Sequence, residues 1–325
     1  GVMDDEKYFE RDTFRSGKGG MCDPSLIRVL STQSAEAVRW LMDELGVDLA
    51  ELSQLGGHAF KRTHRARPTP SGDPRPIGWL IMERVQAFVK ERLPPGQVEI
   101  RTSARVVKLE VDENQEGGRC ASLLPPLKTV TGVTYEDLTT GKIQTLSADA
   151  VVLTTGGYGC DLTPTSLLKE HRPDLLGSEA KGYGGNGDNG GNGDNGKGSK
   201  TLGMPSTNGA FATGDGVKMG SALGALTVDM DKVQLHPTSF VDPKDPLNPT
   251  KILGPEALRG SGGILINHEG KRFVNELDLR SVVSNAILKQ CKPFICKDGQ
   301  AGNVFAWCIL NQEAQKKFGS SSLRF

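Results

Sequence analysis

The sequence predicts a mixed α/β fold, and three observations support that prediction. Apolar residues recur at helical spacing over residues 23–46 and again over residues 80–89. From Val98 onward the apolar spacing changes to a period of two, which is typical of strands. The apolar run 150–153 then ends at two glycines, as a buried strand does where it enters a tight turn.

Start and stop signals define the expected helices. Asp23 and Pro24 suit an N-cap and the first helical position, and Gly46 suits a stop, so we expect two short helices between them. A third helix is expected from Leu80 to just before Pro94. The segment between these helices, GGHAFKRTHR, is polar and is expected to form a loop.

Strands are expected next, joined by polar or glycine-containing turns. The candidates form a small antiparallel meander over residues 98–101, 106–111, 130–135 and 143–146.

The later part of the chain predicts a domain change. Residues 182–198 are rich in Gly, Asn and Asp, which predicts a disordered surface loop. A helix from Thr213 to Ala225 and a strand over 227–233 should follow. We expect one domain at 1–230 and a second at 231–325.

Composition excludes several classes of protein. Lys and Arg number 39 against 39 Asp and Glu, so no net field favours nucleic acid or an anionic membrane surface. No apolar stretch approaches the roughly 18 residues of a membrane span, and the acidic start is unlike a signal peptide. Six scattered cysteines, with no metal-binding spacing, favour reduced thiols in an intracellular compartment, either the cytoplasm or an organelle. A soluble protein without a metal site is expected.

Two glycine turns are candidate ligand sites. Thr155, Gly156 and Gly157 follow the apolar run, and their backbone could approach a phosphate or a carbonyl closely. Asp215 lies at a probable helix N-terminus, which attracts anions or polar ligand atoms. An ordinary tight turn is the alternative for the first site, and an ordinary first helical turn is the alternative for Asp215.

Charged residues gather in the segment 252–280. Glu256 and Arg259 are three residues apart, so one helical turn places the carboxylate beside the guanidinium. A hairpin over 264–267 and 272–275 should follow, and Arg280 precedes a helical run. His236 stands before a proline, which could aim its imidazole at a carboxylate. A surface salt bridge and a structural histidine remain the alternatives.

Several ordered motifs together resemble the flavoprotein subunits of fumarate reductases and succinate dehydrogenases, most closely the soluble fumarate reductases. The matching segments are GGHAFKRTHR (56–65), TTGG (154–157), TNGAFATGDGVKMG (207–220), QLHPT (234–238) and EALRGSGGILINHEGKRFVNE (256–276), followed by Arg280. The short step from Arg259 to Arg280 is similar to the soluble type.

The resemblance implies an FAD-binding domain of the two-dinucleotide-binding type with an inserted α+β capping domain. Noncovalent FAD would pass a hydride to one olefinic carbon of fumarate, and Arg280 would protonate the other. Glu256 and Arg259 would return the proton to Arg280, with Glu256 also beside the substrate, and His236 would bind a substrate carboxylate. The implied flavin contacts are Val106, Thr155, Gly156, Gly157 and Asp215.

Parts of the family pattern are missing. Nothing near the start resembles the strand, GxGxxG turn and acidic residue of the FAD-binding βαβ unit, and no C-terminal segment supplies the remaining substrate contacts. We therefore expect an internal fragment that alone binds FAD poorly and has little activity. The electron donor, a redox module or an NADH-dependent reductase, would lie outside this chain. A related reductase of another unsaturated acid or a steroid enone, and a noncatalytic binding protein, stay open as alternatives.

Overall fold

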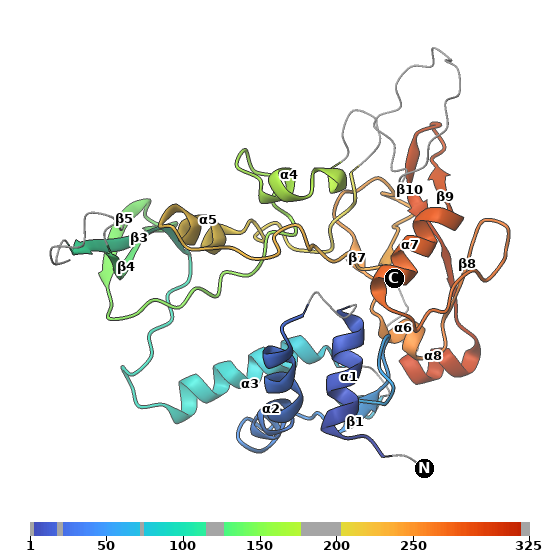
Figure 1. Ribbon diagram of the computed structural model, residues 1–325, viewed down its shortest axis with the longest axis horizontal. Coiled ribbons are helices and arrows are strands. Elements are labelled where there is room, and N and C mark those ends of the chain that lie inside the picture. The colour runs from blue at the N-terminus through green and yellow to red at the C-terminus, as the bar shows by residue number, and fades with distance from the viewer. Residues whose placement is uncertain (1–2, 18–21, 72–74, 115–126, 177–202, 320–325) are drawn as a thin grey trace. The chain divides into compact units, whose positions relative to one another are not determined.

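The computed structural model describes residues 3–17, 22–71, 75–114, 127–176 and 203–319, and confirms the mixture of helices and strands (Figure 1). The predicted disordered tract at 182–198 lies outside the described residues. The chain divides into two compact units. The first unit comprises residues 1–98, 234–247 and 251–325, and the second comprises residues 99–233 and 248–250.

The first unit begins with two packed helices, α1 (Glu6–Ser16) and α2 (Pro24–Asp43). Asp23 caps α2 by accepting from the Ser25 amide, as its sequence position predicts. The prediction of two short helices before Gly46 was wrong, because α2 is continuous. Its polar middle lacks glycine and proline, and the Thr32 hydroxyl donates to the Arg28 carbonyl within the helix.

The third expected helix is confirmed as α3 (Ile77–Arg92). It packs on α2 and the segment that follows α2 to form an apolar cluster. The buried members of this cluster are Leu45, Val47, Leu49, Ala66 and Leu80.

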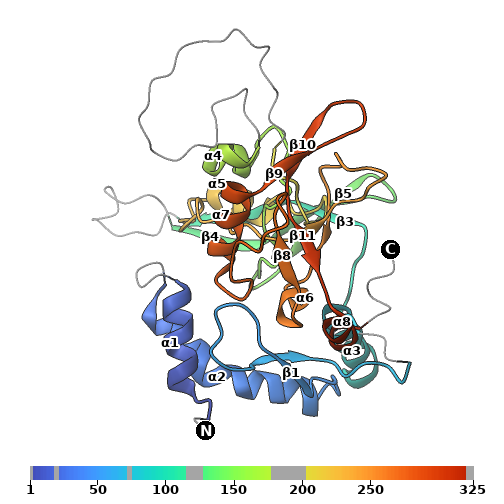
Figure 2. The same ribbon diagram turned by 90° about the vertical axis from the view of Figure 1, so that its right-hand side faces the viewer.

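Short strand pairs and three helices complete the first unit. The pairs are β1 (Glu51–Ser53) with β2 (Thr63–Arg65), β6 (Ser239–Phe240) with β7 (Ile252–Leu253), β8 (Ile264–Ile266) with β11 (Trp307–Ile309), and β9 (Lys292–Ile295) with β10 (Ala301–Phe305). The helices are α6 (Ala257–Gly260), α7 (Arg280–Gln290) and α8 (Gln312–Phe318). All the pairs are antiparallel, and β8 lies beside β11 (Figure 2).

The expected hairpin at 264–275 is only partly formed. Beyond β8, a single bridge joins Ile266 to Arg272. Leu265 of β8 and Val283 of α7 are the centre of a second apolar cluster, with 1% and 0% exposure. This cluster anchors the start of α7, where Arg280 is located.

The second unit contains the predicted meander. Strands β3 (Ala104–Asn114), β4 (Leu127–Asp137) and β5 (Lys142–Ser147) pair in sequence order. The predicted strand at 98–101 was wrong, because no described strand pairs with it. Among the described residues, the helices that follow in this unit are α4 (Leu167–His171), the short 3-10 helix η2 (Pro173–Leu175) and α5 (Asp215–Ala222).

Two other strand predictions in the second unit were also wrong. The runs 150–153 and 227–233 form no strand, and Val152, Leu226 and Val228 are 81%, 95% and 80% exposed. A strand requires a hydrogen-bonding partner, and none of the described segments supplies one here. Apolar content alone therefore predicted strands that the described chain does not form.

No helix among the described residues is long and apolar enough to cross a membrane. Cysteines within the described ranges form no disulfide.

Candidate active site

Glu256 and Arg280 form an ion pair within the first unit. Glu256 directly precedes α6, and Arg280 is the first residue of α7. The Nε of Arg280 donates to Oε2 of Glu256 over 2.9 Å, and its Nη1 donates to the Gln234 side-chain oxygen over 3.0 Å. The Glu256 side chain is 8% exposed and that of Arg280 is 39% exposed. The guanidinium therefore has a buried partner on one side and an accessible face on the other.

The environment of Glu256 favours its ionised form. Burial alone would raise the pKa of Glu256, but hydrogen bonds from Arg280 and from the Gly56 amide outweigh burial and hold that pKa below its ordinary value. The Gly56 amide lies 2.7 Å from Oε1. Each carboxylate oxygen therefore has its own donor, one from a side chain and one from the backbone.

Arg259 lies within electrostatic range of Glu256 and Arg280 and is almost completely enclosed. It is 2% exposed, and its Nη1 donates to the Glu276 carbonyl over 2.7 Å. Its Nε and Nη2 have no hydrogen-bond partner among the described residues. Burial lowers the pKa of Arg259, and the attraction of Glu256 only partly opposes this. A buried guanidinium with free donors is a better acid than an exposed one.

His236 lies within electrostatic range of all three charged residues. Its Nδ1 is 2.8 Å from the Thr238 carbonyl and 3.3 Å from the Thr238 amide, so the tautomer decides whether Nδ1 donates to the carbonyl or accepts from the amide. Burial lowers the pKa of His236, and the charges of Arg280 and Arg259 lower it further. In the tautomer that donates to the closer carbonyl, the neutral ring presents an unprotonated Nε2, which becomes a donor to an anion when the ring gains a proton.

The structure thus brings together Glu256, Arg259, Arg280 and His236, which the sequence singled out. Sequence reasoning assigned no role to Gln234 or Gly56, although both lie in the motifs QLHPT and GGHAFKRTHR.

Glu276 was missed as well. It is 3% exposed, and its carboxylate accepts from Arg272 and from the Leu265 amide. These bonds fix the position of Glu276, whose backbone carbonyl accepts the hydrogen bond from Arg259. The spacing of four residues between Arg272 and Glu276 was the available signal.

The expected flavin contacts lie in the second unit, where two glycine turns meet. The Thr155 hydroxyl accepts from the Gly216 amide over 3.1 Å, and the Gly214 amide donates to the Gly157 carbonyl over 3.1 Å. Gly156 has φ +77°, and a Cβ there would meet no atom within 4 Å. The backbone of this turn is therefore open to a ligand.

A pocket of about 310 Å³ lies beside the turns, lined by Leu153, Thr155, Gly156, Gly216, Ser221 and Thr227 among others. The backbone amides and hydroxyls around it fit one polar portion of a flavin nucleotide. Asp215 begins α5 next to it, where it accepts from the Thr213 hydroxyl. Val106 lies on β3 opposite Tyr135 and does not line this pocket.

Among the described residues, no cluster of His, Cys, Asp and Glu could hold a metal ion.

Known proteins resemble this chain along most of its length. A family model described as an FAD binding domain matches residues 1–301. A fumarate reductase of Schizosaccharomyces pombe is 35% identical over 292 residues, which cover 90% of this chain and 48% of that protein. Fumarate reductase 1 of Saccharomyces cerevisiae is 35% identical over 89% of this chain and 52% of its own length.

A solved structure of a fumarate reductase also resembles this chain. The open conformation of a flavocytochrome c3 fumarate reductase matches with a TM-score of 0.62 and 31% identity, covering 97% of this chain and 43% of that chain. The present chain spans about half the length of the curated relatives it matches.

Proposed function

The chain belongs to the FAD-binding family of flavoproteins, and from this premise we propose that it carries the proton-delivery residues of an enzyme that reduces fumarate to succinate. The cofactor is FAD. The observation that carries the proposal is the ion pair between Arg280 and Glu256, with the buried Arg259 within its electrostatic range. The expected capping domain from residue 231 onward, which would include these residues, is part of the proposal.

FAD, when bound, would supply the hydride equivalent for one olefinic carbon. Arg280 holds the proton for the other carbon on its accessible guanidinium face. Arginine is a weak acid, but the developing carbanion is strongly basic, and the positive charge stabilises it before the proton moves. Because an arginine stays protonated across the physiological range, the donor is always loaded.

Glu256 would return a proton to Arg280 along the existing 2.9 Å contact. Arg259 would pass a proton to Glu256 and regain one from solvent, so that the relay ends as it began. Its Nε and Nη2 have no hydrogen-bond partner among the described residues, and burial lowers its pKa. The same carboxylate also keeps Arg280 oriented between its transfers.

His236 would bind one carboxylate of the substrate. Two neighbouring guanidinium groups favour a dianion in this region, which supports a dicarboxylate over an enone. The electrons would reach the flavin from a donor module or an NADH-dependent reductase outside this chain. The free thiols among the described cysteines support an intracellular location.

The test is a substrate panel in single turnover. The protein used here and in the tests below is the whole enzyme that carries this chain, loaded with FAD, because the chain alone is expected to bind FAD poorly. It is reduced without oxygen and mixed with fumarate, crotonate or cyclohexenone, and flavin reoxidation is followed by absorbance. We expect fumarate to reoxidise the flavin at least a hundredfold faster than the other two. Equal rates with crotonate would exclude recognition of a second carboxylate, and a preference for the enone would exclude the proposed substrate.

A further inference from the structure

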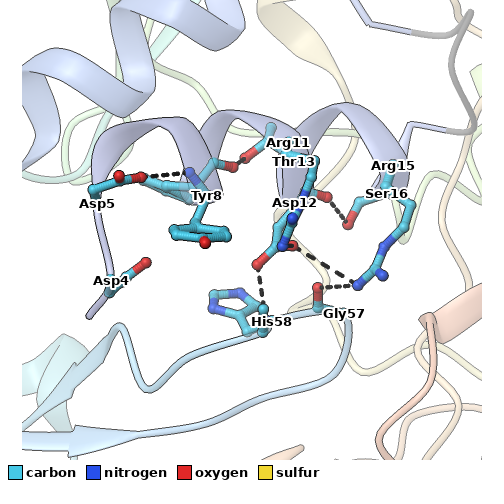
Figure 3. A network of polar contacts seen from close by, with 12 residues as sticks. Asp4, Asp5, Tyr8, Arg11, Asp12, Thr13, Arg15, Ser16, Gly57 and His58 are labelled. Atoms are coloured by element: carbon cyan, nitrogen blue, oxygen red, sulfur yellow. Dashed lines mark hydrogen bonds and ion pairs between the residues drawn. The ribbon is translucent and has the colours of Figure 1, made fainter. Parts of the chain in front are cut away.

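Helix α1 carries a buried carboxylate that the proposed chemistry does not use. Asp12 is 4% exposed, and its Oδ2 accepts from the Ala59 amide over 2.8 Å and from Nη1 of Arg62 over 2.7 Å. Its Oδ1 lies 3.9 Å from Nη2 of Arg15. Figure 3 shows Asp12 and Arg15 on α1 facing the loop that carries Gly57 and His58. A carboxylate removed from water to this extent is retained only with such partners.

The loop that Asp12 holds also contacts Glu256 through the Gly56 amide. Nη2 of Arg15 donates to the Gly57 carbonyl over 3.3 Å, and the Gly57 amide donates to the Leu277 carbonyl over 3.1 Å. The preceding residue, Gly56, gives its amide to Glu256. Hydrogen bonds and the loop backbone of residues 56–59 therefore connect Asp12 to the carboxylate that binds Arg280.

The loop backbone also packs against the Glu256 carboxylate. A Cβ on Gly56 would lie 2.7 Å from the Asp278 carbonyl oxygen and 2.9 Å from Oε1 of Glu256. Gly57 has φ +80°, a conformation that glycine adopts without strain. With so little space, a small displacement of the loop changes the position of the carboxylate.

We infer that Asp12 is a positioning residue for the proton relay. By holding Ala59 and Arg62 it fixes the loop 56–62, so that the Gly56 amide occupies one oxygen of Glu256 and leaves the other oxygen for Arg280. This inference rests on the proposed function, because it assigns Asp12 to the relay of that reaction.

The test compares Asp12→Ala, Asp12→Asn and Asp5→Ala in the FAD-loaded protein. Asp5 is a matched control, because it caps the same helix through the Tyr8 amide but is exposed and does not touch the loop. We expect Asp12→Ala to lower kcat for fumarate about ten- to hundredfold, the range that small misplacements produce, with KM changed less than about threefold. Asp12→Asn keeps an acceptor for Ala59 and should recover most of kcat.

Hydrogen exchange gives a readout that does not depend on turnover. Amides 56–59 should exchange at least about tenfold faster in Asp12→Ala than in the wild type or in Asp5→Ala, because the loop loses its anchor. If Asp12→Ala does not fold, Arg62→Gln removes the guanidinium that pairs with Asp12 and with Asp4. It must show both changes to a smaller extent, because the Ala59 amide keeps its bond to Asp12.

The outcomes test the positioning role of Asp12 separately from the proposed reduction of fumarate. Unchanged exchange and unchanged kcat in Asp12→Ala would overturn the inference, and so would an equal loss of kcat in Asp5→Ala. A wild-type protein that fails to reduce fumarate would overturn the proposed function, while faster exchange of amides 56–59 would still establish that Asp12 holds the loop at Glu256.

Discussion

Gly56→Ala perturbs the candidate site by the smallest possible change, one methyl group. The new Cβ would have to move from 2.7 Å to about 3.4 Å from the Asp278 carbonyl oxygen, and from 2.9 Å to about 3.4 Å from Oε1 of Glu256. These are displacements of about 0.7 Å and 0.5 Å, against a backbone oxygen and a buried carboxylate. The amide hydrogen bond to Glu256 must lengthen or break.

The expected result is a loss of kcat for fumarate of about ten- to hundredfold, since misplacements of this size in a reacting constellation have effects of that order. The change in activation free energy is then about 1.4–2.7 kcal/mol. Steady-state kinetics with excess electron donor measures it, and KM should change little because Gly56 contacts Glu256, whereas the proposed carboxylate-binding residue is His236.

Gly78→Ala is the control for adding a methyl group. Gly78 lies in the first turn of α3, and a Cβ there meets no atom within 4 Å. Alanine is the better helix former by about 1 kcal/mol, so this variant should be at least as stable as the wild type and fully active. If Gly56→Ala kept the wild-type kcat while folding normally, the Gly56 contact would not position Glu256.

Three further changes test single parts of the structure. Glu256→Gln keeps the shape of the side chain but cannot carry a proton, so we expect kcat to fall at least a hundredfold while an FAD spectrum remains; a smaller loss would remove Glu256 from the relay. Fumarate should bind more tightly as pH falls, because a protonated His236 gains a donor at Nε2, and KM should rise by up to about tenfold per pH unit above the pKa of His236; in His236→Gln the pH dependence should disappear, and an unchanged dependence would assign it to another group. Asp161 is fully buried and pairs with Lys218, and although burial raises its pKa, hydrogen bonds from Thr163 and the Leu167 amide hold that pKa below its ordinary value. The contribution of Asp161 to stability is therefore complete above about pH 4 and is lost as pH falls through the lower folded-state pKa. Asp161→Asn should reduce the free energy of unfolding at pH 7 by about 2 kcal/mol, measured by chemical denaturation. Equal losses at pH 7 and pH 3 would contradict this prediction.

Local signals predicted α3, the start of α2 and the three paired strands of the meander, but they divided α2 into two helices, missed α1 and added a strand at 98–101. The Asp23 cap, the helical spacing up to Val89 and the alternation in β3, β4 and β5 are decided by neighbouring residues, so a single sequence contains them. The runs 150–153 and 227–233 failed because a strand depends on partners distant in sequence, and none is supplied by the described residues.

The charged residues of the candidate site could be predicted from the sequence, but the neutral groups that hold them in place could not. Glu256 and Arg259 are close in sequence, and the motif that contains them resembles a known family. The Gly56 amide and the Gln234 side chain meet this site only through tertiary folding, and neither residue type is distinctive. A backbone amide leaves no trace in side-chain chemistry, so sequence reasoning had no means to find it.

Proton donation by Arg280 is tested most directly by the reoxidation of reduced flavin by fumarate in Arg280→Ala. The FAD-loaded variant and wild type are reduced without oxygen, mixed with fumarate, and followed through a single turnover by flavin absorbance. If Arg280 is the proton donor, the variant keeps its flavin spectrum but reoxidises at least a thousandfold more slowly. A variant that binds flavin and keeps a tenth or more of the wild-type rate would show that the proton comes from another group.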